Sequence, residues 1–582
     1  MKKNQGFTLI EVLITVAIFA IFTLGIYFTY ANVIEVIGKS RNRTLGSEVL
    51  NREIEIIRNL PYEGVGIIGG FPAGDLTQSK QVNFEGNIFE VETFVRNVDD
   101  PFDGTVDGDP VDLAPADYKL VEFYVDCLTC GGFVPLTFTT WIAPRHLETS
   151  TENGSLFINV FDASGVPVSG ADVVIENSAV DPSFTIIDTT NASGTLRLVD
   201  VPPSNNSYEI SVSKSGYTSS RTYEIGSDEN PNPLKPHATV ATQEITSISF
   251  SIDRVSALNI STRNMFCQGV PEIDFNHTGQ RLIGSGPDVL EYAVSYSTDS
   301  LGKITVNDIP WDSHTLVDTD PYYGVGGSSY LMPVTLAPNE TKTLDFFVDL
   351  IGSSSLLVTA TNEQGVALTG VDVSLEKLGF NESRVTGEYN YLYSDWSFGG
   401  YLSQDGNIEE NLVPGQLTLK QIGGEYPTST NSWLTSNTID FGTSTANLLT
   451  LSWSGNTPGG TQISFQVASN NGGAFNYIGP DGTNSSYYTT SGANLSNFHS
   501  GNQFVRYKVY LNTTVSTATP TLYDLDIKFN SGCIPKSQVF WADIPSASYD
   551  ISASKSGYQT ATTTVFVGAG WQEIKVPLII NE

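Results

Sequence analysis

The sequence predicts a mainly β protein that begins with one long α-helix. Three observations carry this prediction. The first sixty residues hold a long apolar run followed by an amphipathic one, the remainder is rich in the residue types of strands and tight turns, and segments of the chain repeat each other. At 582 residues the chain is too long for one core, so several domains are expected.

The N-terminal helix is expected over residues 7–60. The run 7–30 is apolar apart from several Thr and the carboxylate of Glu11, and it is long enough to cross a bilayer. Apolar residues then recur at helical spacing until Pro61 ends the pattern. We therefore predict a transmembrane segment over 7–30 that continues into an amphipathic one, in all roughly 80 Å long at about 1.5 Å per residue.

Glu11 is the one ionisable residue inside the apolar run. A carboxylate in a membrane span costs a few kcal/mol or more unless something pairs with it, so such a residue points to function. An ordinary secretory signal has a shorter apolar core followed by a small-residue cleavage site, and neither feature is present. Glu11 therefore needs a partner, unless it lies near the membrane interface and reaches water there.

The stretch "KKNQGFTLIEVLITV" resembles the prepilin signature of type IV pilins and type II secretion pseudopilins, a short basic leader ending in Gly, then Phe and Thr-Leu-Ile-Glu. This resemblance implies that residues 1–6 are a leader, cut between Gly6 and Phe7 by a membrane-embedded prepilin peptidase, and that the new Phe7 amine is methylated. It also implies the partner of Glu11. In pilin assembly this carboxylate pairs with the cationic amine of an adjacent subunit, and two buried opposite charges satisfy each other.

Residues 61–147 resemble the globular region of minor pilins, which have a small antiparallel sheet packed on the helix. The resemblance rests on "IRNLPYEGVGIIGGFPAG", "VRNVDDPFDGT" and "PADYKLVEFYV". Cys127 and Cys130 lie at the tip of a predicted hairpin, where a disulfide would staple the turn. A redox motif is the alternative, but the residues that follow read as a returning strand rather than a helix. Pairing of Cys267 with Cys533 is left open.

The segment "VDDPFDGTVDGDPVDLAPAD" is the most acidic loop of the chain. Hard cations prefer several carboxylate oxygens from a flexible loop. The resemblance to secretion pseudopilins, whose major members hold calcium in an equivalent loop, implies the same ion here. Calcium is therefore the one cofactor expected, with Asp99, Asp100, Asp103, Asp107 and Asp109 as ligands, while Asp112 and Asp117 belong to the same loop. The alternative is a solvated turn shaped by its Pro and Gly residues.

Self-comparison indicates a repeated domain. Residues 156–177 align without a gap with 356–377, as strand, Gly turn and strand. Farther on, "SYEISVSKSGY" from Ser207 aligns with "SYDISASKSGY" from Ser548. The offsets of 200 and 341 positions differ by 341 − 200 = 141, so the third repeat contains an insertion. A weaker middle copy is visible in "TDSLGKITVNDIPW" at 298–311, which parallels "TNASGTLRLVDVPP" at 190–203.

These repeats resemble carboxypeptidase regulatory-like domains, which are transthyretin-like seven-stranded sandwiches. The expected boundaries are 152–253, 254–350, and 354–425 with 533–582, the last interrupted by a jelly-roll-like or lectin-like sandwich over 426–532. In that insertion Trp453, Tyr487 and Tyr488 would stack on a sugar, and core packing is the alternative explanation of the three rings.

Charge and composition limit the function. The net charge is −34, and because residues 1–60 carry 7 − 5 = +2, the remainder carries about −36, which repels nucleic acid. The five His include no His-x-x-Glu pair for a catalytic zinc, and no Gly-x-Ser-x-Gly elbow occurs. No enzymatic activity is therefore expected.

The leading hypothesis is a non-enzymatic minor pilin, anchored in the bacterial cytoplasmic membrane with its head outside and then displayed on a pilus or the cell surface. Its expected partners are the prepilin peptidase, other pilin subunits, the membrane, and a surface glycan or protein bound by the sandwiches. One alternative is a minor pseudopilin of type II secretion or DNA uptake. Another is a membrane-anchored surface protein that binds or hydrolyses glycans.

Overall fold

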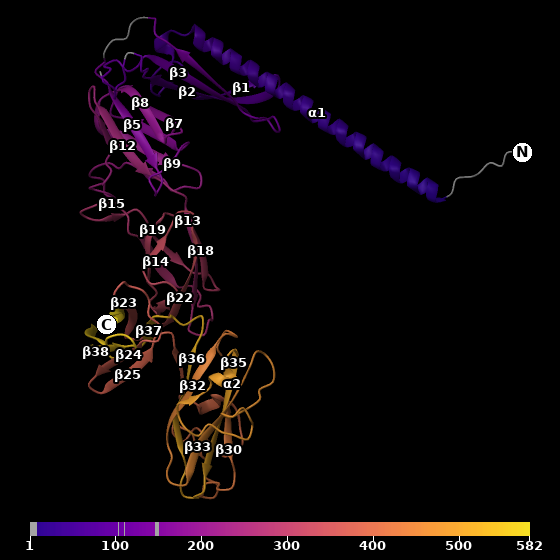
Figure 1. Cartoon of the computed structure of the whole chain (residues 1–582), viewed down its shortest axis with the longest axis vertical. Helices are drawn as coiled ribbons and strands as arrows, with labels where there is room; N and C mark the ends of the chain where they lie inside the picture. The colour runs from indigo at the N-terminus through magenta and orange to yellow at the C-terminus, as the bar shows by residue number, and fades with distance from the viewer. Residues whose placement is uncertain (1–8, 103, 110, 146–150, 582) are drawn as a thin grey trace, which may run out of the picture. The chain divides into compact units, whose positions relative to one another are not determined.

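The computed structural model describes residues 9–102, 104–109, 111–145 and 151–581 (Figure 1). Within them one long helix precedes an otherwise strand-dominated chain, which confirms the mainly β prediction. The chain divides into two compact units. The first is Met1–Arg254 with Leu282–Val289, and the second is Val255–Arg281 with Leu290–Glu582. The helical elements are α1 (Leu9–Asn59), the turns η1 (Tyr62–Gly64) and η2 (Ser397–Gly399), and α2 (Ser496–His499).

Helix α1 packs on a four-stranded antiparallel sheet in the order β1-β2-β3-β4. The strands are β1 (Ser79–Phe84), β2 (Asn87–Val98), β3 (Tyr118–Cys127) and β4 (Leu136–Ile142). The helix enters the core at Leu45, and Val49 and Ile57 are 1% exposed against Val121 and Phe123 of β3. Only the last turns of α1 are therefore held by the sheet, and residues 31–44 of the amphipathic segment stay largely exposed.

The first sandwich follows in the same unit. Its sheets have the orders β12-β5-β8 and β10-β9-β6-β7, with β11 on β9. The strands are β5 (Gly154–Phe161), β6 (Asp172–Asn177), β7 (Phe184–Thr189), β8 (Thr195–Val201), β9 (Ser204–Ser213), β10 (Ser220–Arg221), β11 (Ala238–Val240) and β12 (Ile245–Ser251). This sandwich contacts the sheet below α1: Arg96 pairs with Asp188 at 3.4 Å, and the rings of Phe71 and Phe184 lie 5.4 Å apart.

The second sandwich has the sheets β18-β13-β22-β20 and β17-β14-β19-β21. The strands are β13 (Ser256–Arg263), β14 (Asp274–Gly279), β17 (Ala293–Ser297), β18 (Lys303–Ile309), β19 (Asp312–Asp318), β20 (Tyr323–Ser328), β21 (Val334–Leu336) and β22 (Thr341–Leu350). Between β14 and β17 lies the hairpin of β15 (Leu282–Gly284) and β16 (Val289–Leu290). The expected boundary at residue 254 does not hold for this hairpin, because residues 282–289 belong to the first unit. There, Asn230 donates to the Ile283 carbonyl at 3.0 Å.

The third sandwich has the sheets β37-β23-β40 and β25-β24-β38-β39. The strands are β23 (Ser354–Asn362), β24 (Asp372–Lys377), β25 (Phe380–Val385), β37 (Gln538–Trp541), β38 (Ala547–Ser554), β39 (Ala561–Val567) and β40 (Gly570–Leu578). Its side-chain bonds repeat those of the first sandwich. Tyr549 Oη donates to Pro545 as Tyr208 Oη does to Pro202, and Lys555 Nζ bonds to the Thr369 carbonyl.

The inserted sandwich begins earlier than the expected residue 426. Strand β26 (Tyr389–Tyr393) pairs along β36 (Thr521–Asn530), so residues 389–425 belong to the insertion and not to the third sandwich. Its sheets are β26-β36-β32-β34 and β27-β30-β35-β31, with β33 on β35. The remaining strands are β27 (Tyr401–Gln404), β28 (Ile408–Glu409), β29 (Thr418–Leu419), β30 (Ser432–Ser436), β31 (Ile439–Asp440), β32 (Asn447–Asn456), β33 (Thr461–Asn470), β34 (Ala493–Asn494) and β35 (Phe504–Thr513).

The core of the second sandwich contains two buried histidines. His277 of β14 and His314 of β19 are 0% exposed, and their ring centroids lie 4.8 Å apart beside Tyr292. Neither ring nitrogen of His277 has a hydrogen-bond partner among the described residues, whereas His314 Nε2 lies 2.8 Å from the Pro310 carbonyl. Burial lowers the pKa of His277 to about 3, with His314 adding to the shift, and burial also lowers the pKa of His314. Both rings are therefore neutral in the folded state.

The histidine pair predicts acid sensitivity of the second sandwich. An unfolded histidine has a pKa of about 6.5, so the folded state binds fewer protons than the unfolded one. The stabilisation is complete above about pH 6.5 and is lost as the pH falls toward about 3, at roughly 1.4 kcal/mol per pH unit for His277. We expect His277→Phe to flatten this acid dependence and His237→Gln, in the first sandwich, to leave it unchanged. Hydrogen-exchange mass spectrometry of peptides from β14 and β19 measures how the stability of this sandwich changes with pH. Equal acid sensitivity of His277→Phe and the unmodified chain would contradict the prediction.

Candidate functional site

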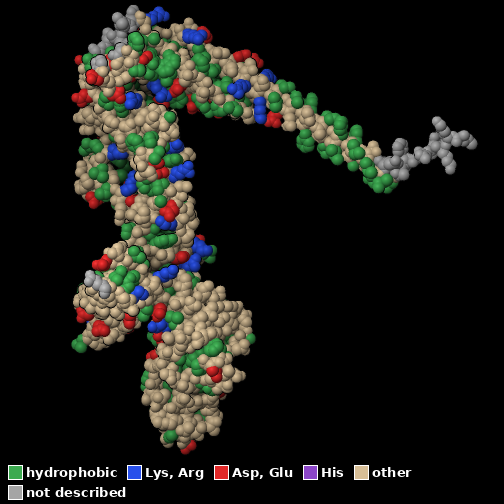
Figure 2. Space-filling view, viewed as in Figure 1, with side chains coloured by type: hydrophobic (Ala, Val, Ile, Leu, Met, Phe, Trp, Pro, Cys, Tyr) green, Lys and Arg blue, Asp and Glu red, His purple; other side chains and the backbone are tan. Residues whose placement is uncertain are grey.

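The N-terminal part of α1 exposes an almost unbroken apolar surface. Gly6 and Phe7 lie outside the described residues, and of Glu11 the structure describes the helical backbone. No charged residue occurs between positions 12 and 34, and Phe19, Ile21 and Phe22 are each about 70% exposed. Figure 2 shows this apolar surface along the helix. Among the described residues this helix is the one long and apolar enough to cross a membrane, and a surface of this kind marks a lipid or protein contact.

The charged half of α1 begins at Glu35. Lys39 pairs with Glu35 at 2.7 Å, and Arg58 pairs with Glu55 at 2.8 Å. Burial of apolar residues at the sheet begins at Leu45, after the Glu35–Lys39 pair and before the Glu55–Arg58 pair. The helix therefore has two chemically distinct segments, one suited to lipid or to other helices and one that carries the head.

Two disulfides involve all four cysteines. Cys127 bonds to Cys130 at the end of β3, with the two Cα atoms 5.4 Å apart, and both are buried in the core below α1. Cys267 bonds to Cys533, the pairing that the sequence left open, and joins the turn after β13 to the segment between β36 and β37. Disulfides of this kind are typical of domains outside the cytoplasm.

The acidic loop brings together a different set of carboxylates from the one expected. Oxygens of Asp99, Asp112 and Asp117 lie within 4.8 Å of one another. The loop folds back on itself, with Asp112 N bonded to Thr105 O at 3.1 Å and Asp117 N bonded to Val98 O at 3.1 Å. This reversal places the C-terminal end of the loop beside Asp99, which local spacing does not reveal.

The other carboxylates of the expected calcium set point elsewhere. Asp107 pairs with Arg197 at 3.2 Å, Asp109 is exposed, and Asp100 Oδ1 accepts the Phe102 N–H at 3.1 Å. Asp103 lies outside the described residues. The structure therefore does not group Asp100, Asp107 and Asp109 with Asp99, and calcium binding by this loop stays a prediction.

The three clustered carboxylates fit a hard cation. Burial raises the pKa of the Asp99 carboxyl, and the charges of Asp112 and Asp117 raise it further against the hydrogen bond from Val106 N. Asp99 Oδ1 and Asp112 Oδ2 are buried without a hydrogen-bond partner among the described residues. Calcium takes six to eight oxygen ligands, so three carboxylates would provide the charged part of such a site.

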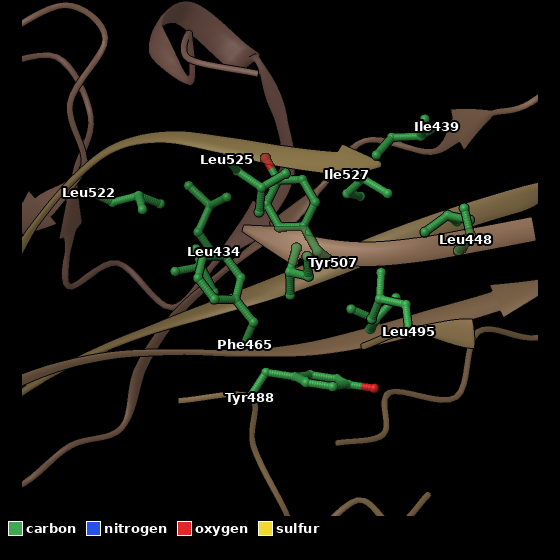
Figure 3. Packing of buried hydrophobic residues seen from close by; sticks show 14 of the residues in the cluster. Leu434, Ile439, Leu448, Phe465, Tyr488, Leu495, Tyr507, Leu522, Leu525 and Ile527 are labelled. Atoms are coloured by element: carbon green, nitrogen blue, oxygen red, sulfur yellow. The ribbon is translucent and has the colours of Figure 1, made fainter. Parts of the chain in front are cut away.

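The three aromatic residues expected to stack on a sugar do not form one surface. Tyr488 is 2% exposed and belongs to the core of the inserted sandwich, beside Phe465 (Figure 3), so it cannot stack on a sugar and core packing, the alternative explanation, applies to this residue. The Trp453 ring lies 4.7 Å from Phe465, while the Tyr487 ring lies 5.0 Å from Tyr510. Trp453 and Tyr487 therefore pack against different strands, β33 and β35.

Comparison with protein families identifies two parts of the chain. Residues 1–27 match the prokaryotic N-terminal methylation motif, and residues 155–251 match the carboxypeptidase regulatory-like domain. The chain carries a prepilin motif. This motif and the apolar helix behind it fit a membrane-anchored pilin that is assembled into surface pili. No curated protein matches the chain.

Solved structures provide distant similarities. The Bacillus anthracis TIE protein has 15% identity, covers 49% of this chain at a TM-score of 0.15, and is itself spanned over only 55% of its length. The shaft pilin SpaA of Lactobacillus rhamnosus GG has 11% identity and a TM-score of 0.15, with 34% of this chain and 98% of that one covered. A minor pilin of Streptococcus agalactiae has 12% identity and a TM-score of 0.17, with coverage of 34% and 97%. At these TM-scores the similarities carry no argument about function.

The carboxylate cluster predicts stabilisation by calcium. Because Ca²⁺ would relieve the repulsion among three nearby carboxylates, we expect it to raise the unfolding temperature of the region below α1 and EDTA to reverse the effect. At a calcium concentration roughly 100 times Kd the gain is about 2.7 kcal/mol. Asp112→Asn should remove most of it, and Asp109→Asn, a change of the same kind at an exposed position, should not. Equal calcium responses of the two variants in thermal unfolding would rule the site out.

Proposed function

We propose that the chain is a non-enzymatic minor type IV pilin-like subunit. Its N-terminal helix is held in the membrane before assembly and enters a filament afterwards, and its β domains are displayed for adhesion. The observation that carries this proposal is the continuity of α1 over Leu9–Asn59: the charge-free apolar run and the segment packed on an antiparallel sheet form one helix, and the matched prepilin motif covers residues 1–27. A static anchor has no need of the processing motif.

The alternative within the same machinery is a minor pseudopilin of type II secretion or DNA uptake. The motif and the helix suit both roles, since both require a processed helix that leaves the bilayer. The large head favours display, because the four-stranded sheet below α1 already supports the helix and three sandwiches with an inserted fourth are not needed for that. The charge of about −36 outside residues 1–60 disfavours direct capture of DNA.

Glu11 is assigned the role of pairing with the amine of a neighbouring subunit. Within a bundle of apolar helices a lone carboxylate is strongly disfavoured, and a cationic amine nearby offsets this cost. Removal of residues 1–6 would create that amine at Phe7. Processing and assembly are thereby linked, because the uncut chain lacks the partner for Glu11 at this position.

Processing is tested by N-terminal mass spectrometry of the native protein from cells with and without the prepilin peptidase. We expect a mature chain that starts at methylated Phe7 in the first case and at Met1 in the second. The physical reason is the placement of the cleavage site at the border of the apolar run, within reach of a membrane-embedded protease. An uncut chain in cells that hold the peptidase would make the protein a static membrane anchor.

Assembly is tested with Glu11→Ala. We expect at least a roughly tenfold loss of incorporation into sheared filaments, since one favourable ion pair of about 1.4 kcal/mol or more is removed. Glu35→Ala is the matched control, because this carboxylate lies on the same helix but pairs with Lys39 of its own chain. Immunoblots of filament and membrane fractions measure the distribution. Normal incorporation of Glu11→Ala would overturn the pairing argument.

A further inference from the structure

A cleft of about 540 Å³ lies where the second sandwich, the third sandwich and the inserted sandwich meet within the second unit. Strand β26 and Asp526 of β36 supply one wall, β25 and Phe540 supply another, and the turn after β13 closes the third side with Phe266. We call this the junction cleft. Its volume lies in the range typical of small-molecule sites.

The junction cleft combines apolar and polar surface. The apolar part of its lining comes from Phe266, Leu392 and Phe540, and the large side chain of Leu392 is 65% exposed. Arg384, Asn390 and Asp526 line it with planar polar groups. A ligand that matches both must have an apolar face and an edge of hydrogen-bonding groups.

The charges around the cleft are largely paired with one another. Arg384 Nη2 lies 3.3 Å from Glu382, and Lys528 Nζ lies 3.4 Å from Glu388. Asn390 Nδ2 donates to Asp526 Oδ2 at 3.0 Å. The two ion pairs leave the cleft no excess of positive charge for an anion, and Asp526, which accepts from Asn390, has no ion-pair partner within 4.0 Å among the described residues.

Asp526 is the polar group whose hydrogen bonding is incomplete. Its Oδ1 atom is buried without a hydrogen-bond partner among the described residues, which costs free energy in an isolated chain. Burial raises the pKa of this carboxyl to about 6, against the lowering effect of Lys528. The terminal torsion of Asp is broad, so the carboxylate can rotate and present an oxygen to a donor inside the cleft.

The walls of the cleft are fixed relative to one another before any ligand arrives. The Cys267–Cys533 disulfide ties the turn after β13 to the end of the insertion. Phe266 stacks on Phe529 at 5.6 Å, and a side chain on Gly442 would collide with the Phe266 carbonyl. Across the two regular sandwiches Trp571 Nε1 donates to the Val325 carbonyl at 2.7 Å. A preorganised cleft loses little entropy on binding.

We propose that the junction cleft binds a neutral saccharide. A sugar ring has an apolar C–H face for Leu392 and Phe266 and a rim of hydroxyls that both donate and accept, which suits Asp526, Asn390 and Arg384 together. The proposal rests on the adhesive role proposed above and adds the ligand class and the place where it binds.

Binding is tested with the purified full chain in nanodiscs free of glycolipid, since glycoside detergents would compete. The probes are glucose, galactose, mannose, N-acetylglucosamine and N-acetylgalactosamine, with sialic acid and putrescine as anionic and cationic comparators. Saturation-transfer NMR and calorimetry report binding. We expect saturable binding of at least one neutral sugar, and binding of both comparators at least roughly tenfold weaker.

Two variants locate the site. Asn390→Ala changes an exposed residue and so leaves folding intact, and Asp526→Asn removes the carboxylate with little change of shape. Each should weaken sugar binding at least roughly tenfold. Asp524→Asn is the matched control, because Asp524 lies two residues away on β36 but bonds to Ser454 outside the cleft. Unchanged thermal unfolding of Asp526→Asn verifies that the variant is folded.

The proposal is overturned if no neutral sugar binds the unmodified chain, or if putrescine or sialic acid binds best. It is also overturned if both cleft variants bind sugar as the unmodified chain does, or if Asp524→Asn loses as much affinity as the cleft variants. The readout does not depend on filament assembly. A chain with Glu11→Ala that stays out of filaments should still bind sugar, so failure of the pilin proposal and failure of the cleft proposal are distinguished.

Discussion

The structure depends on one constraint: the apolar, charge-free segment of α1 must be surrounded by something other than water. Nothing among the described residues covers the side chains from Leu13 to Ile34, whereas the buried apolar side chains from Leu45 onward are packed on β1–β4. Lipid satisfies the first segment before assembly, and the helices of other subunits satisfy it afterwards. The position of Glu11 directly before this segment, inside the apolar run 7–30, then matters, because a carboxylate in lipid is costly unless a group of opposite charge lies beside it.

The β domains solve a different problem, that of joining sandwiches in series. In each regular sandwich the opening strand pairs in parallel with the closing strand, β5 with β12, β13 with β22, and β23 with β40. Since both strands run in the same direction, the chain enters at one end of the domain and leaves at the other. A few residues therefore suffice to reach the next domain, as in the four residues 252–255 between β12 and β13. The repeated sequence encodes this arrangement three times.

The sequence predicted what local pattern and self-similarity encode. The helix follows from periodicity, the repeats follow from self-comparison, and the sheet below α1 was implied by the resemblance to minor pilins. Tyr208 and Tyr549 even make the same bond in the first and third copies. The start of the insertion was missed because residues 389–425 have no counterpart in another repeat, and their alternation suits a strand of either sandwich. Tyr487 and Tyr488 differ in burial because neighbouring side chains of an extended segment face opposite ways. The sequence alone does not tell which of the two rings faces the core.

The carboxylate cluster and the second disulfide escaped prediction for another reason, since both depend on how distant segments meet. Asp99 finds Asp117 because the loop reverses between them, and Cys267 finds Cys533 across a sequence separation of 266. The insertion is joined to its host sandwich through residues 386–388 and 531–537, and the disulfide adds a third covalent connection, to the second sandwich. Closing so long a loop restricts the unfolded chain, and the stacking of Phe266 on Phe529 fixes the same joint in the folded state. The second, third and inserted sandwiches are thus linked at one junction by a disulfide and by stacked rings, and these links allow the cleft between them to keep its shape.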